Sequence, residues 1–162
     1  MRPIITTTTT TTVISVLGVL SMLAGCALLR EGVRIGPDQA RQEAVAFLRE
    51  SMLHERLEWP AVPEPVATEC GGGAAGVRFE YMVVVESQID PERLARSDES
   101  FWRSKGLNVR PAEEDSGEYG TVYGATARAG GKPWGAFELS QRGVNLYAYS
   151  QCVDGSPDDY EN

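Results

Sequence analysis

One alternating run organises the domain that this sequence predicts: Val77-Arg78-Phe79-Glu80-Tyr81-Met82-Val83-Val84-Val85-Glu86. Every odd-numbered position holds a valine or an aromatic residue, and most even-numbered positions are charged. Because side chains of a β-strand point alternately to the two faces of its sheet, this pattern predicts a strand with one strongly apolar face. We expect it to be the central strand of the fold.

Upstream of this strand, the sequence predicts a helix from Pro37 to about Leu57. Pro37 and Asp38 suit the first turn of a helix. Apolar residues recur at helical spacing on one face: Ala40, Ala44, Val45, Phe47, Leu48 and Met52. We expect this face to pack on the sheet. Three prolines within residues 59–65 then end the helix and favour an extended connection.

Downstream, Asp90-Pro91-Glu92 supplies the N-cap, first position and acidic first turn of a second helix, which ends at Gly106. Residues 107–111 are a candidate short strand, and residues 113–118 are expected to form a polar turn. Three strands follow at residues 119–128, 134–141 and 144–153, and their short connections require antiparallel neighbours. The predicted class is α+β: an N-terminal helix packed on a four- to five-stranded antiparallel sheet, with a second helix between the first strand and the meander.

The N-terminal segment carries a different signal. An apolar run begins at Val13 and ends at Leu23-Ala24-Gly25-Cys26, with the length of a signal-peptide core. The tetrad resembles the bacterial lipobox. This resemblance implies that Cys26 becomes the first mature residue and carries a diacylglycerol and an acyl chain that anchor the protein on the extracytoplasmic side of the cell membrane. The alternative is an uncleaved anchor helix from Val13 to Leu29.

These boundaries predict four segments. They are a lipoprotein signal peptide at residues 1–25, a lipidated tether at residues 26–36, a single α+β domain at residues 37–153 and a disordered acidic tail at residues 154–162. With Cys26 assigned to lipid, Cys70 and Cys152 remain, and an oxidising compartment favours a disulfide between them. The bond would make the first and last strands antiparallel neighbours. The alternative is two unrelated buried thiols.

Composition and motifs argue against several kinds of chemistry. The net charge of −8 makes a nucleic-acid partner unfavourable. His54 is the only histidine, so with both other cysteines paired we expect no usual zinc site and no cofactor. Ser51 shares a helix face with His54, but acyl transfer also needs an orienting acid and oxyanion donors. We therefore predict that the protein is not an enzyme; the alternative is a cell-envelope hydrolase that uses carboxylates.

Alternation along the strands predicts a face for a partner. The helix-covered face would take one set of residues: Phe79, Val83, Val122, Phe137, Leu139, Leu146 and Ala148. The opposite face would then hold the aromatic residues Tyr119, Tyr123, Trp134, Tyr147 and Tyr149, among Arg78, Glu80, Arg128 and Glu138. Aromatic rings among charges are typical of interface hot spots. The alternative is that the second helix covers this face through Leu94, Phe101 and Trp102.

The whole chain resembles the small secreted lipoproteins of high-GC Gram-positive bacteria, which are mostly of unknown function. The resemblance rests on the lipobox, an alanine-rich first helix, a cysteine before the first strand, Trp102 and Gly106 in the middle, and the closing Ser150-Gln151-Cys152. It implies no catalytic residue. Together these features predict a lipid-anchored extracytoplasmic protein, without enzymatic activity, that binds a small ligand or an envelope partner protein.

Overall fold

One antiparallel sheet dominates the computed structural model, which describes residues 35–72 and 74–160. Its six strands are β1 (Val66–Glu69), β2 (Val77–Glu86), β3 (Asn108–Asp115), β4 (Thr121–Arg128), β5 (Trp134–Ser140) and β6 (Gly143–Tyr149). They are ordered β1-β2-β6-β5-β4-β3 across the sheet. The predicted α+β class is confirmed, with six strands where four or five were expected. The candidate lipobox and the Val13–Leu29 run lie outside the described residues.

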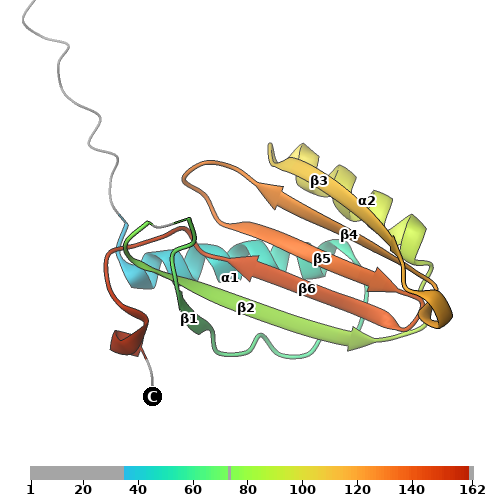
Figure 1. Cartoon of the computed structure of the whole chain (residues 1–162), viewed down its shortest axis with the longest axis horizontal. Coiled ribbons are helices and arrows are strands. Elements are labelled where there is room, and N and C mark those ends of the chain that lie inside the picture. Colours follow the sequence, from blue (N-terminus) through green and yellow to red (C-terminus); the bar gives the residue numbers. More distant parts are fainter. Residues whose placement is uncertain (1–34, 73, 161–162) are drawn as a thin grey trace, which may run out of the picture. The chain divides into compact units, whose positions relative to one another are not determined.

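Helices α1 (Pro37–His54) and α2 (Pro91–Ser104) both lie on one face of this sheet. Helix α1 packs over β2, β6 and β5, and α2 packs over β3, β4 and β5 (Figure 1). The core between the layers contains buried residues from both: Ala40, Ala44, Leu48, Leu94, Trp102, Val77, Phe79, Val83, Phe137, Leu139, Leu146 and Ala148. Neither described helix is long and apolar enough to cross a membrane.

The predicted signals for the start and end of α2 are confirmed. The Asp90 carboxylate accepts a hydrogen bond from the backbone N–H of Arg93 at 3.1 Å, which satisfies one free donor of the first turn. Pro91 occupies the first helical position, where no N–H is needed. After Ser104 the chain leaves the helix through Gly106, whose φ of 79° is accessible to glycine at little cost.

Trp102 locks the two helices to the sheet. Its fully buried ring lies between Phe47 of α1 and Phe137 of β5, with centroid separations of 5.9 and 5.1 Å. Its indole N–H donates to Ser51 Oγ at 3.0 Å, and that hydroxyl donates to the Phe47 carbonyl at 3.1 Å. Gly135 lies directly beneath Phe47, and a Cβ added to this glycine would be only 2.5 Å from a carbon of the Phe47 ring. A small residue at this point of β5 therefore lets α1 approach the sheet.

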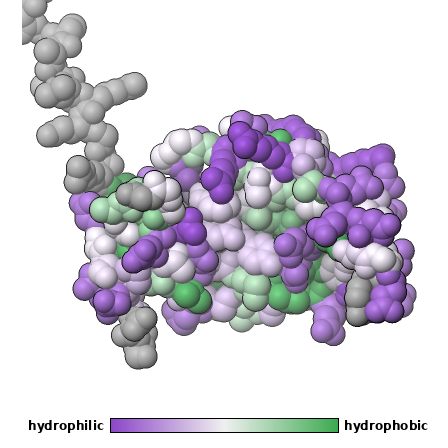
Figure 2. All heavy atoms as spheres, viewed as in Figure 1, coloured by the Kyte–Doolittle hydropathy of each residue, from purple (hydrophilic) through white to green (hydrophobic). Residues whose placement is uncertain are grey.

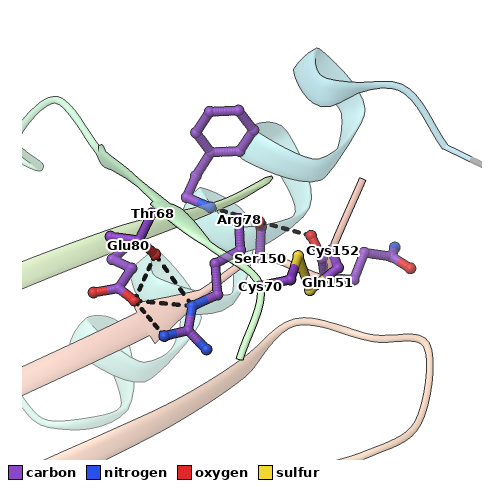
Figure 3. A network of polar contacts seen from close by, with 8 residues as sticks. Thr68, Cys70, Arg78, Glu80, Ser150, Gln151 and Cys152 are labelled. Carbon is purple, nitrogen blue, oxygen red and sulfur yellow. Dashed lines mark hydrogen bonds and ion pairs between the residues drawn. A yellow bond between two sulfur atoms is a disulfide. The ribbon is translucent and has the colours of Figure 1, made fainter. Parts of the chain in front are cut away.

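The predicted disulfide between Cys70 and Cys152 is confirmed (Figure 3), and β2 is paired antiparallel with β6. The bond joins the segment before β2 to the segment after β6. Beside it, Ser150 Oγ accepts from the backbone N–H of Phe79 at 2.9 Å and donates to the Gln151 carbonyl at 2.8 Å. The disulfide and these hydrogen bonds hold the same end of the central strand pair.

Two edge strands differ from the sequence prediction. The extended connection was expected over residues 59–65 and no strand was predicted after it, but Val66–Glu69 forms β1 and pairs with β2. β3 was expected to stop near Pro111, and instead it continues through the acidic residues up to Asp115. Both strands lie at sheet edges. At an edge, a strand as short as β1 can form on a longer neighbour, and Pro111 of β3 can lack an N–H because no further strand needs that donor. The turn moves to residues 116–120, around the 3-10 helix Gly117–Tyr119.

The prediction of disorder after residue 153 is corrected for residues 154–160. Pro157–Tyr160 form a 3-10 helix, η2. The Tyr160 ring packs edge-on against Phe79 at a centroid distance of 5.0 Å. The Arg41 guanidinium of α1 lies over both rings, 4.4 Å from the Phe79 centroid and 4.8 Å from that of Tyr160. The acidic composition suggested a solvated tail, but one aromatic residue is enough to dock it.

Candidate binding face

The sheet face opposite the helices is uncovered within the described part of the chain. Both helices lie behind the sheet in the view of Figure 1, and Figure 2 shows the uncovered face from the same side. Pale and green spheres cross its middle and purple ones border it, so less polar surface is framed by hydrophilic surface. We call this surface the open face. Its side chains come from the even-numbered positions of β2, β4 and β5 and the odd-numbered positions of β6.

Three aromatic rings stack on the open face. Trp134 of β5 lies directly opposite Tyr149 of β6, and their rings are nearly parallel, with centroids 3.8 Å apart and planes 12° from each other. Tyr147 is two residues before Tyr149 on the same strand, with ring centroids 6.5 Å apart. Stacking restricts the rotamers of these side chains before any partner arrives, so binding would cost less conformational entropy.

Two arginines flank the stacked rings. The Arg128 guanidinium lies 4.1 Å from the Trp134 centroid, and that of Arg78 lies 5.4 Å from the Tyr149 centroid. Arg78 is also held by Glu80, with Nη2 2.7 Å and Nε 2.9 Å from Oε1, and Thr68 donates to the same oxygen at 2.9 Å (Figure 3). These contacts across β1 and β2 fix one border of the aromatic surface.

Tyr147 and Tyr149 remain neutral hydrogen-bonding groups at ordinary pH. Burial, followed by the Glu138 carboxylate, raises the pKa of Tyr147. Burial, followed by Glu80, raises the pKa of Tyr149. The Tyr147 hydroxyl donates to Glu138 Oε2 at 3.2 Å, and the Asn145 amide donates to the same oxygen at 3.2 Å. The polar end of the Tyr147 ring is therefore oriented as well as its plane.

Apolar side chains extend the aromatic surface along β2. Met82 lies opposite Tyr147 and is 52% exposed, and Val84 follows at 45% exposed. A shallow cavity of about 260 Å³ continues from Val84 towards Val122 and Glu138. Exposed methionine and valine beside stacked rings form a contiguous apolar strip, which is the usual character of an interaction surface.

The opposite end of the open face is basic. A groove of about 740 Å³ between β3 and β4 is lined by Arg110 and Arg128, together with Asn108 and Thr126. Among the described residues, no carboxylate forms an ion pair with either guanidinium. In a chain with a net charge of −8, two such arginines side by side offer a local site for an acidic group.

Most of the predicted partner face is where the sequence placed it. Trp134, Tyr147 and Tyr149 share the open face with the predicted charged residues. Tyr123 does not, because it pairs with Leu139 and so lies on the helix-covered face, beside Glu92 and Arg96 of α2. Val122 takes the open-face position instead. The side chain of Tyr119 is outside the described part of the structure.

The alternative that α2 covers the aromatic face is wrong. Trp102, the largest side chain of α2, packs on Phe137, which points into the core beneath α1 and α2. Leu94 is buried in the same core. The second helix therefore continues the layer begun by α1 and leaves Trp134, Tyr147 and Tyr149 uncovered.

A second cluster joins the two helices away from the open face. His54 ends α1, Glu55 is its C-cap, and Asp98 lies in α2. Ligand atoms of the three side chains are all within 4.8 Å of one another. Burial, reinforced by the neighbouring Glu55 carboxylate, raises the pKa of Asp98 to about 8. Glu55 is 9% and Asp98 5% exposed, so a polysaccharide could not reach both carboxylates without separating the helices.

Comparisons with known proteins add one distant likeness. No protein-family model matches the chain, and no curated protein sequence matches it. A solved structure, a DUF4853 family protein from Actinomyces odontolyticus, is similar with a TM-score of 0.43 and 18% sequence identity. The alignment covers 73% of this chain and 64% of that chain, so this chain spans less than two thirds of the length of that protein. A likeness this distant does not bear on function.

Proposed function

We propose that this protein is a lipid-anchored, extracytoplasmic binding protein that holds an envelope partner protein on its open face. The observation that carries the proposal is the stack of Trp134, Tyr147 and Tyr149, flanked by two arginines on an uncovered sheet face. Tryptophan, tyrosine and arginine are the residues most enriched among interface hot spots. The proposal includes no catalytic step.

The geometry of the rings favours a protein as the occupant. Side chains stand roughly perpendicular to a sheet, so rings stacked across Trp134 and Tyr149 present their edges outward. Such a surface suits a partner that also contacts the apolar strip at Met82 and Val84, over several strands at once. The basic groove at Arg110 and Arg128 would face an acidic side chain of that partner, so binding should weaken as salt rises.

The location is supported by the N-terminal sequence and by the disulfide. The tetrad ending at Cys26 fills every position of the lipobox pattern. A bond between Cys70 and Cys152 suits an oxidising compartment outside the cytoplasm. Diacylglycerol and an acyl chain on Cys26, followed by the tether of residues 26–36, would keep the domain at the membrane surface of the kind of bacterium whose lipoproteins it resembles.

Site-specific photo-crosslinking in the intact envelope tests the proposal. A photoreactive residue replaces Met82 on the open face, and a matched variant carries it at Leu53 of α1, which is 80% exposed. We expect a discrete protein adduct from Met82 and none of that size from Leu53. Equal adducts from both positions, or no adduct from Met82, would contradict the proposal.

Alanine variants then assign the adduct to the aromatic surface. Trp134→Ala and Arg128→Ala should each weaken binding by at least about 30-fold if they are hot spots worth about 2 kcal/mol. Arg49→Ala removes an exposed positive charge from α1 and is the control for net charge. Loss of one stacked ring costs about 0.5–1.5 kcal/mol beyond its buried area, so the Trp134 variant should still fold. An adduct unchanged in both variants would mean that the partner does not use the rings.

A further inference from the structure

We propose that His54, Glu55 and Asp98 bind a divalent transition-metal ion at the junction of α1 and α2. The three side chains supply one imidazole nitrogen and two carboxylate groups, all within 4.8 Å of one another. Two come from the end of one helix and one from the middle of the other, so an ion here would join the helices. This site is separate from the open face and does not depend on the proposed function.

A buried oxygen without a hydrogen bond points to a missing cation. Glu55 is only 9% exposed, and its Oε1 atom is inaccessible to solvent. This oxygen accepts no hydrogen bond. It faces His54 Nε2 at 3.5 Å. Leaving such an oxygen unsatisfied is costly, because burial removes its water and nothing replaces it. A metal ion between the three groups would supply the missing interaction.

The donor set selects the class of ion. Imidazole with carboxylates suits zinc, manganese, iron, cobalt or nickel, whereas magnesium and calcium prefer oxygen donors alone. Ligand atoms about 2.1 Å from a tetrahedral ion are about 3.4 Å apart, so the side chains need to move by only about 1 Å to close around one. Three protein ligands would leave at least one position for water.

The surroundings hold the histidine and leave a route to it. The His54 ring stacks on Phe101 of α2, with centroids 4.3 Å apart and planes 9° from each other. Ser97 Oγ is hydrogen-bonded to Nε2 at 3.0 Å. An ion at Nε2 would displace this hydroxyl, which could then contact a water bound to the ion. The imidazole is 30% exposed, so an ion can enter from this side while Glu55 and Asp98 remain buried.

The competing explanation is a proton shared by the two carboxyl groups with no metal bound. Titration calorimetry of the chelator-treated full chain with zinc chloride and then manganese chloride separates the two. All proteins carry Cys26→Ser, which removes a free thiol that could bind zinc. We expect saturable binding of one ion per chain, weakened at least about 10-fold by Asp98→Asn and by Glu55→Gln. Glu58→Gln, at an exposed carboxylate just after the cluster, is the control and should not change the affinity.

Cobalt absorption gives a readout of the histidine. Bound cobalt should show visible bands that change in His54→Gln, because a nitrogen ligand is lost. Asp98→Asn keeps the shape of the side chain and replaces a buried carboxyl group with a neutral amide, so a folded variant is expected even if His54→Gln is unstable. Absence of saturable binding, or affinity unchanged by both Asp98→Asn and Glu55→Gln, would overturn the proposal in favour of the shared proton.

Discussion

Replacing Ser51 by alanine should destabilise the domain through Trp102 rather than through Ser51 itself. The serine hydroxyl is the acceptor for the indole N–H at 3.0 Å, and both residues are almost fully buried. Alanine leaves that N–H without a partner, which costs about 1–3 kcal/mol. Alanine also improves helix propensity by up to about 0.5 kcal/mol, so we expect a net loss of about 0.5–3 kcal/mol in the free energy of unfolding.

A double-mutant cycle isolates this hydrogen bond. In Trp102→Phe the donor is absent, so adding Ser51→Ala should cost almost nothing, and the coupling energy should be about 1–3 kcal/mol. Urea unfolding followed by far-ultraviolet circular dichroism suits the cycle, because removing a tryptophan does not remove the signal. A coupling energy below about 0.5 kcal/mol, the usual limit of additivity, would refute the role assigned to Ser51.

Three further outcomes are expected. Mass spectrometry should find a mature protein that begins at lipid-modified Cys26, and a wild-type protein of full precursor mass would contradict this. Replacing Cys70 and Cys152 by alanine should lower the free energy of unfolding by about 4 kcal/mol, because a bond that spans 82 residues restricts the unfolded chain. A loss under about 1 kcal/mol in urea unfolding would contradict this reasoning. In metal-free buffer the pKa of Asp98 is about 8 when folded and near 4 when unfolded. Unfolding therefore releases a proton between these two pKa values, so the free energy of unfolding should fall from pH 4 to pH 8 by at most about 1.4 kcal/mol per pH unit. Asp98→Asn should flatten this slope. A flat profile for the wild-type protein would contradict the assignment.

The central part of the fold was predictable because its signals are local and strong. Alternation along Val77–Glu86 identified β2, and the Asp90-Pro91 start identified α2. The pairing of β2 with β6 followed from the cysteine pair. The edge strands gave weaker signals, because an edge strand needs no apolar face of its own. β3 is exposed over most of its length and therefore tolerates residues 113–115, whose acidic composition resembles a turn.

The candidate site was predictable only where side-chain parity was clear. In β5 and β6, the alternation places Phe137, Leu139 and Leu146 on the core face, and Trp134, Tyr147 and Tyr149 on the other. In β4 the buried positions hold Ala125 and Ala127, so small side chains on both faces conceal the alternation. Only the pairing of Tyr123 with Leu139 determines which face Tyr123 takes. Register of this kind depends on neighbouring strands and cannot be taken from one segment alone.

The metal-site candidate was missed for a related reason. Counting histidines and cysteines left out the carboxylates that the fold brings to His54. Asp98 did carry a signal, since it lies four residues from both Leu94 and Trp102 and so falls on the buried stripe of α2. A charged residue on such a stripe indicates a partner on another element. Its identity as Glu55 follows only from the packing of α2 against the end of α1.

The edges of the sheet bear on how many copies of this protein can share one membrane. Anchored as we propose, the domains would be crowded in two dimensions, where any free strand edge can pair with that of a neighbour. β1 offers only four residues at its edge. β3 interrupts its hydrogen-bonding groups with Pro111 and continues into Glu113, Glu114 and Asp115, whose negative charges would repel those of a second copy. The same two strands that the sequence marked most weakly would thus keep the sheet from growing between molecules.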